Sequence, residues 1–68
     1  MKHVSGKRLA QVAKENGWVF CSQEGSYAKF RNPISGRSII IPIHGNHDLR
    51  IGLQHYLMKV LDITDDDL

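Results

Sequence analysis

Two short polar connections between β-prone segments constrain this chain more than any other feature of its sequence. Residues 22–26 separate the segment 18–21 from one that begins at Tyr27, and residues 32–37 separate that second segment from residues 38–43. Connections this short, and rich in Gly, Asn, Pro and Ser, are typical of β-hairpins. The centre of the chain is therefore predicted to be three antiparallel strands.

Helical patterns flank these strands. Ser5 is suited to cap a helix over residues 6–16, and Gly17 is suited to end it. A second helix is predicted over residues 50–61 from an apolar stripe at helical spacing. The stripe consists of Leu53, Tyr56, Leu57, Val60 and Leu61, with Gln54, His55 and Lys59 pointing outward. Thr64 and the aspartates after it resemble the start of a further short helix.

Side chains of a strand alternate between two faces, which assigns the residues of the second strand. Tyr27, Lys29 and Arg31 fall on one face. One aromatic ring and two cations suit a polyanion, because cations meet phosphates and the ring can stack on a base. The competing interpretation is a solvated outer sheet face. Ala28 falls on the opposite side with Phe30, which is the presumed core side.

Two apolar segments are assigned to the core. The consecutive isoleucines of residues 39–41 predict a strand buried on both faces. Pro42 lacks a backbone donor, so it is expected at the strand end or at an edge. Cys21 is predicted to be a small core residue rather than a nucleophile, because no neighbouring histidine or cation would activate its thiol.

Length and charge limit the number of domains, the class of partner and the compartment. The 68 residues form one domain at most, residues 1–68, and end in an acidic tail at residues 62–68. All 9 Lys and Arg residues lie before that tail, so the body of the chain is basic, which favours nucleic acid. No apolar run approaches the roughly 20 residues of a membrane span, and no signal peptide is evident. The cytoplasm is the expected compartment, and no membrane partner is expected.

A polar connector at residues 44–48 raises the question of a metal. His44, His47 and Asp48 are residue types that bind zinc. Only these three lie close together, on a loop, and no fourth ligand is positioned by spacing. The interpretation as an ordinary polar loop is therefore favoured, and no metal and no cofactor is expected.

The order helix, strand, strand, strand, helix predicts an α+β fold, with two helices on one face of a three-stranded antiparallel sheet. The double-stranded-RNA-binding domain has this order. Over residues 5–64 the chain resembles the HicA family of toxin–antitoxin ribonucleases. The motifs that carry the resemblance are Gly17-Trp18, Gly25-Ser26-x-x-x-Phe30, Ile41-Pro42-x-His44 and Leu49-x-x-Gly52-Leu53-x-x-x-Leu57.

The resemblance implies a toxin that acts as a metal-independent endoribonuclease on mRNA. It also implies a HicB-like antitoxin protein that neutralises the toxin in a hetero-oligomer. In that family a histidine after the Gly-Ser pair acts in acid–base cleavage, since imidazole can accept the proton of the ribose 2′-hydroxyl. The expected RNA contacts are Gly25, Ser26, Lys29, Arg31 and His44. The alternative interpretation of His44 is a histidine that anchors its loop.

The chain departs from the family where that histidine is expected, because the two candidate positions hold Tyr27 and Ala28. Alanine cannot transfer a proton, and a phenol ionises too far above neutral pH to be a good base. The chain as written is therefore expected to be a weak ribonuclease or none. Either it is a naturally degenerate member, or a histidine at position 28 was replaced by alanine to disarm a toxic protein. The retained remainder of the pattern favours the second account.

Two other classes of function remain open from the sequence. One is a non-catalytic RNA-binding module of the same fold, for which shape and phosphate contacts suffice. The other is a protein-interaction domain whose basic charge is incidental.

Overall fold

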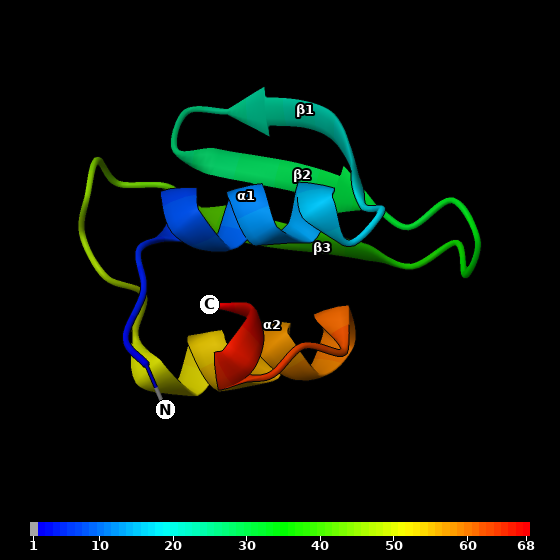
Figure 1. Ribbon diagram of the computed structural model, residues 1–68. Helices are drawn as coiled ribbons and strands as arrows, with labels where there is room; N and C mark the ends of the chain where they lie inside the picture. The colour runs from blue at the N-terminus through cyan, green and yellow to red at the C-terminus, as the bar shows by residue number, and fades with distance from the viewer. Residues whose placement is uncertain (1) are drawn as a thin grey trace.

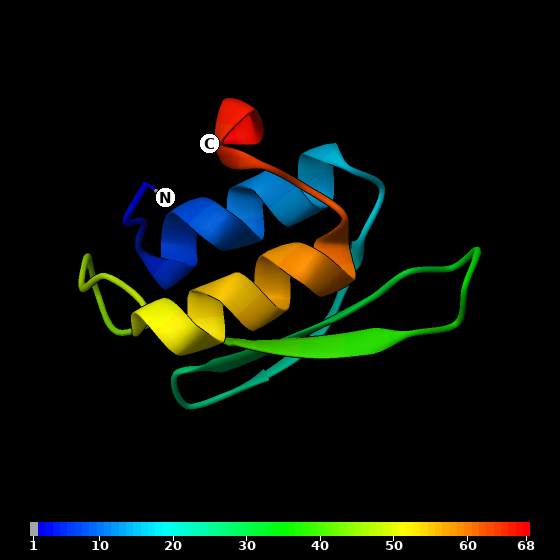
Figure 2. The ribbon, with the colours of Figure 1, turned by 90° about the horizontal axis from the view of Figure 1, so that it is seen from below.

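The computed structural model describes residues 2–68 and arranges them in two layers, with the helices on one face of a sheet (Figure 1). The elements in chain order are α1 (Gly6–Glu15), β1 (Val19–Glu24), β2 (Tyr27–Arg31), β3 (Ser38–Pro42), α2 (Ile51–Leu61) and the 3₁₀ turn η1 (Asp65–Asp67). Seen from below, both helices lie on the same side of the sheet (Figure 2). This arrangement confirms the predicted α+β fold of the double-stranded-RNA-binding type.

Helix α1 begins and ends as its capping residues predict. The Ser5 hydroxyl accepts a hydrogen bond from the backbone N–H of Arg8 (3.1 Å), and Gly17 follows the helix at a φ of +88°. The first turn packs directly on the end of β3, because a Cβ added to Gly6 would lie 1.9 Å from the carbonyl oxygen of Pro42. Glycine at this position therefore sets how closely α1 approaches the sheet.

The sheet has the strand order β1-β2-β3, and both pairs are antiparallel. Its helix-facing side supplies Phe30, Ile39 and Ile41 to the core, each no more than 4% exposed. The other side, here called the outer face, is covered by no element of the described chain. In the ladder between β1 and β2, Phe20 lies opposite Phe30 and Ser22 opposite Lys29, which leaves Cys21 as the extra residue of a β-bulge.

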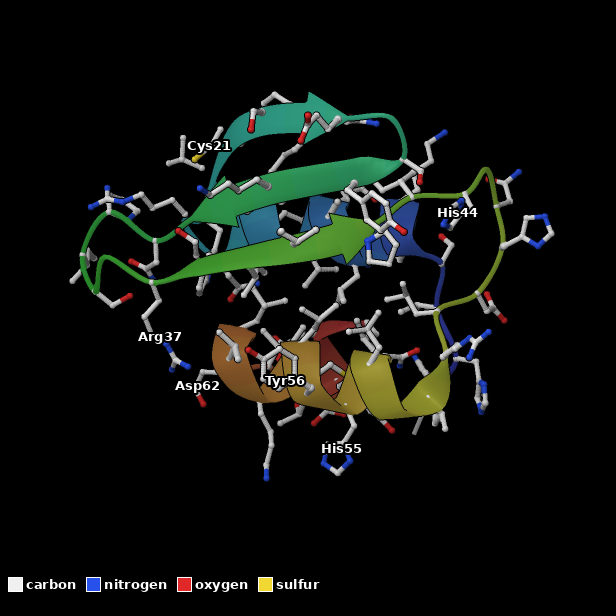
Figure 3. The ribbon with its side chains drawn as sticks, turned by 180° about the vertical axis from the view of Figure 1, so that it is seen from behind. Cys21, Arg37, His44, His55, Tyr56 and Asp62 are labelled. Carbon is white, nitrogen blue, oxygen red and sulfur yellow. The ribbon has the colours of Figure 1, made fainter. Side chains whose placement is uncertain are left out.

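Two of the core assignments made from sequence are wrong. Ile40 is 53% exposed, because both helices cover the same side of the sheet and Ile40 lies on the outer face. The strand β3 therefore alternates instead of being buried on both faces. Cys21 is exposed on the edge strand β1 (Figure 3), where every residue is exposed. It is not a core residue.

The buried side of α2 is also rotated from the predicted stripe. Leu57 and Leu61 are buried as predicted, but Tyr56 is 57% exposed (Figure 3) and Gln54 is fully buried. The reason is the N-terminal segment, which lies against α2. The Gln54 Oε1 atom accepts a hydrogen bond from the Val4 N–H (3.1 Å), and its Nε2 group donates to the Lys2 carbonyl. A polar residue is buried here because the segment supplies its partners.

The C-terminal residues end in the single turn η1, which confirms the predicted short helix. The backbone N–H of Thr64 donates a hydrogen bond to the Asp67 carboxylate (2.8 Å), as part of a capping box. Across residues 2–68, neither helix has the length and apolarity that a membrane crossing requires.

Candidate nucleic-acid interface

The turn that opens β2 is pinned to the end of β3. Gly25 adopts a φ of +57° and is exposed. The half-buried Ser26 accepts a hydrogen bond at its carbonyl from the backbone N–H of Ile43 (2.6 Å), and the Gln23 amide donates to the carbonyl of Gly25 (3.0 Å). The Gly25–Ser26 turn is therefore a fixed, solvent-facing corner of the sheet.

The outer face carries the three residues that alternation assigned to one side of β2. Tyr27, Lys29 and Arg31 are exposed, whereas Ala28 and Phe30 between them are buried. Lys29 pairs across the sheet with Ser22 and Ile40. Two cations and an aromatic ring thus lie on an uncovered surface that can meet phosphates.

Ala28 lies on the opposite side of the sheet and is 1% exposed. It lines a pocket of about 300 Å³ between α1 and the helix-facing side of the sheet, here called the helix-side pocket. The lining residues are Lys7, Ala10, Gln11, Lys14, Phe20, Gln23, Ala28, Phe30 and Ile43. A side chain longer than methyl at position 28 would extend into this pocket.

The structure does not bring Lys29 and Arg31 together with position 28, because the sheet separates them. The cations that share its pocket are Lys7 and Lys14 of α1, which are exposed at their helix surface. The sequence alone does not place Lys7 and Lys14 beside position 28, because they come from another element. The available signal was the i, i+4, i+7 spacing of Lys7, Gln11 and Lys14, which places three polar side chains on one stripe of a helix.

His44 lies just after β3, exposed, at the same corner (Figure 3). Its imidazole meets the Tyr27 ring edge to face, with centroids 6.3 Å apart and an interplanar angle of 82°. Both rings line a second cavity of about 470 Å³, here called the corner pocket. The lining residues are Tyr27, Pro42, His44, His47, Asp48, Leu49, Arg50 and Leu53. Within residues 2–68, no three His, Cys, Asp or Glu side chains are grouped so that they could hold a metal ion.

A comparison with protein families decides the relationship of this chain. The family described as HicA toxin of bacterial toxin-antitoxin matches residues 6–63. The chain belongs to the HicA toxin family. The match runs from the start of α1 to beyond the end of α2 and includes every residue that lines the two pockets. Toxins of this family belong to toxin–antitoxin systems, so membership implies an antitoxin partner. A comparison with curated proteins gave no match.

Proposed function

We propose that this chain is the toxin of a type II toxin–antitoxin system, built as a metal-independent endoribonuclease that cleaves mRNA in the cytoplasm. We further propose that Ala28 leaves it without its proton-transfer group. The observation that carries the proposal is the position of Ala28 in a pocket that also holds Lys7 and Lys14. The HicA pattern expects a histidine at position 27 or 28, and of the two only residue 28 lines this pocket.

A histidine at position 28 would let this pocket cleave RNA by acid–base chemistry. Its imidazole would accept the proton of a ribose 2′-hydroxyl while that oxygen attacks the adjacent phosphorus. The bond from phosphorus to the 5′-oxygen breaks, and the leaving oxygen takes up a proton from solvent water. The products are a 2′,3′-cyclic phosphate and a 5′-hydroxyl end. Lys7 and Lys14 would stabilise the negative charge that develops on the phosphate. The methyl group of Ala28 supplies none of the proton transfers.

The test is the Ala28→His variant, assayed on several RNAs in the presence of EDTA. We expect cleavage that leaves cyclic-phosphate ends, and we expect the unsubstituted chain to leave the same RNAs intact. Ala28→Gln is the matched control, because its side chain is of similar size but cannot exchange a proton near neutral pH. Adding Lys7→Ala and Lys14→Ala to Ala28→His should lower the cleavage rate about 100-fold or more. A folded Ala28→His protein that cuts none of the RNAs would falsify the proposal.

The outer face favours a second candidate, an RNA-binding module that does not cleave. Tyr27, Lys29 and Arg31 offer a ring and two cations without any group placed for proton transfer. This candidate predicts salt-dependent RNA binding by the chain as it stands, with a slope that falls by about one unit for each contacting cation removed. Cleavage by Ala28→His separates the two candidates.

We also propose that the antitoxin is HicB-like and that it docks in part on Lys29 and Arg31. These two cations are exposed on a face that no element of the described chain covers. A partner with carboxylate or carbonyl groups opposite them would be electrostatically complementary.

A further inference from the structure

We infer that the corner pocket holds a nucleobase of the RNA strand, beside the nucleotide whose phosphate occupies the helix-side pocket. The inference rests on the proposed function, since it names how that same RNA is held. The volume of about 470 Å³ lies within the range of roughly 300–1,000 Å³ that is usual for small-ligand pockets. The pocket is therefore large enough for a base and part of its ribose.

The lining of the corner pocket matches the two kinds of surface that a base presents. Pro42, Leu49 and Leu53 supply apolar surface, which suits the flat faces of a base. Asp48 can only accept hydrogen bonds through its ionised carboxylate, and Arg50 can only donate them. A base edge carries both donors and acceptors, so this pair can read an edge rather than merely attract a charge.

The aromatic pair supplies a stacking surface. Tyr27 lines the pocket and is 56% exposed. Its edge-to-face contact with His44 orients both rings while leaving Tyr27 open to an incoming base. Single-stranded RNA is commonly held by stacking of unpaired bases on such rings.

Backbone hydrogen bonds hold the pocket in place. Next to Tyr27 and Pro42, the N–H of Ile43 donates to the carbonyl of Ser26 (2.6 Å), and the N–H of His47 donates to the carbonyl of His44 (3.0 Å). The N–H of Leu49 donates to the carbonyl of Val4 (2.9 Å), which anchors the far side of the loop to the N-terminal segment. Because the pocket is preformed, little free energy of binding is lost in ordering its walls.

The two pockets flank the same pair of backbone segments. Tyr27 lines the corner pocket, and its neighbour Ala28 lines the helix-side pocket. Likewise, Pro42 lines the corner pocket and its neighbour Ile43 lines the helix-side pocket. An RNA strand that crosses the Gly25–Ser26 turn would place neighbouring nucleotides on the two sides of the sheet corner.

The experiment measures binding of a short fluorescein-labelled single-stranded RNA to the full chain, which retains Ala28 and does not need to cleave. Tyr27→Ala should weaken binding about 5- to 100-fold, the range expected from losing one stacked base. Tyr27→Phe should retain most of the affinity, because it keeps the ring. Tyr56→Ala is the matched control, since Tyr56 is equally exposed but lies on α2 outside the pocket.

A second probe, an abasic oligonucleotide of the same length and charge, separates base binding from phosphate binding. The proposal is supported if Tyr27→Ala and His44→Ala weaken binding of the intact RNA and leave binding of the abasic strand unchanged. Equal losses for both strands, or no loss for either, would overturn it. Unchanged RNA affinity with weakened antitoxin binding would overturn it too, and would make the pocket a protein contact. None of these readouts depends on whether Ala28→His cleaves RNA.

Discussion

At the scale of single residues, Gln54 is the polar side chain that is buried in the core among residues 2–68. It is fully buried, and its amide joins α2 to the segment at Lys2 and Val4. Gln54→Leu keeps the volume but leaves the Val4 N–H without its acceptor. We expect a loss of about 1–3 kcal/mol in the free energy of unfolding, measured by urea titration.

The control for Gln54→Leu is the neighbouring residue of the same helix. His55 is exposed, so His55→Leu should change the free energy of unfolding by less than about 0.5 kcal/mol. If the two variants unfolded at the same urea concentration, the segment before α1 would contribute nothing to holding α2.

At the scale of elements, two helical glycines predict opposite effects of the same substitution. A Cβ at Gly6 would collide with the carbonyl oxygen of Pro42, whereas a Cβ at Gly52 would meet no atom within 4 Å. Gly6→Ala should therefore force α1 away from β3 and cost about 1–3 kcal/mol. Gly52→Ala should stabilise α2 by about 0.5–1 kcal/mol, because alanine loses less backbone freedom in a helix.

Thermal unfolding of the two variants measures both effects, and each serves as the control for the other. An unchanged or higher Tm for Gly6→Ala would contradict the close approach of α1 to the sheet, and a lower Tm for Gly52→Ala would contradict the open surroundings of Gly52. Since Lys7 follows Gly6 in α1, Gly6→Ala in the Ala28→His background should also lower RNA cleavage.

The elements that sequence predicted correctly are those whose signals are local. Turn residues and a capping serine define the hairpins and α1 within a few positions of the chain, so the element order follows from the sequence. Whether Ile40, Tyr56 and Cys21 are buried depends on where distant segments pack. The periodicity of the sequence carries no information on that packing. The candidate site divides in the same way: motif order left positions 27 and 28 as candidates, whereas Lys7 and Lys14 reach the pocket beside position 28 from another element.

At the scale of the whole molecule, the proposed contact of the outer face with an antitoxin can be tested by charge reversal. Lys29→Glu combined with Arg31→Glu should weaken the complex with a HicB-like antitoxin about tenfold or more, because like charges then face the partner. Lys59→Glu is the control, since Lys59 is exposed on α2. The measurement is titration of the purified toxin with antitoxin at fixed ionic strength. Equal affinity for both charge-reversal proteins would exclude the outer face as the contact.

The bulge at Cys21 has a consequence for how this small protein behaves at high concentration. Strand β1 is a free edge of the sheet, and a straight free edge is a template for pairing with other chains. The extra residue interrupts the regular row of amide and carbonyl groups along that edge. Deleting Cys21 would straighten the strand, and we expect the shortened chain to form fibrils under conditions where the intact one stays monodisperse.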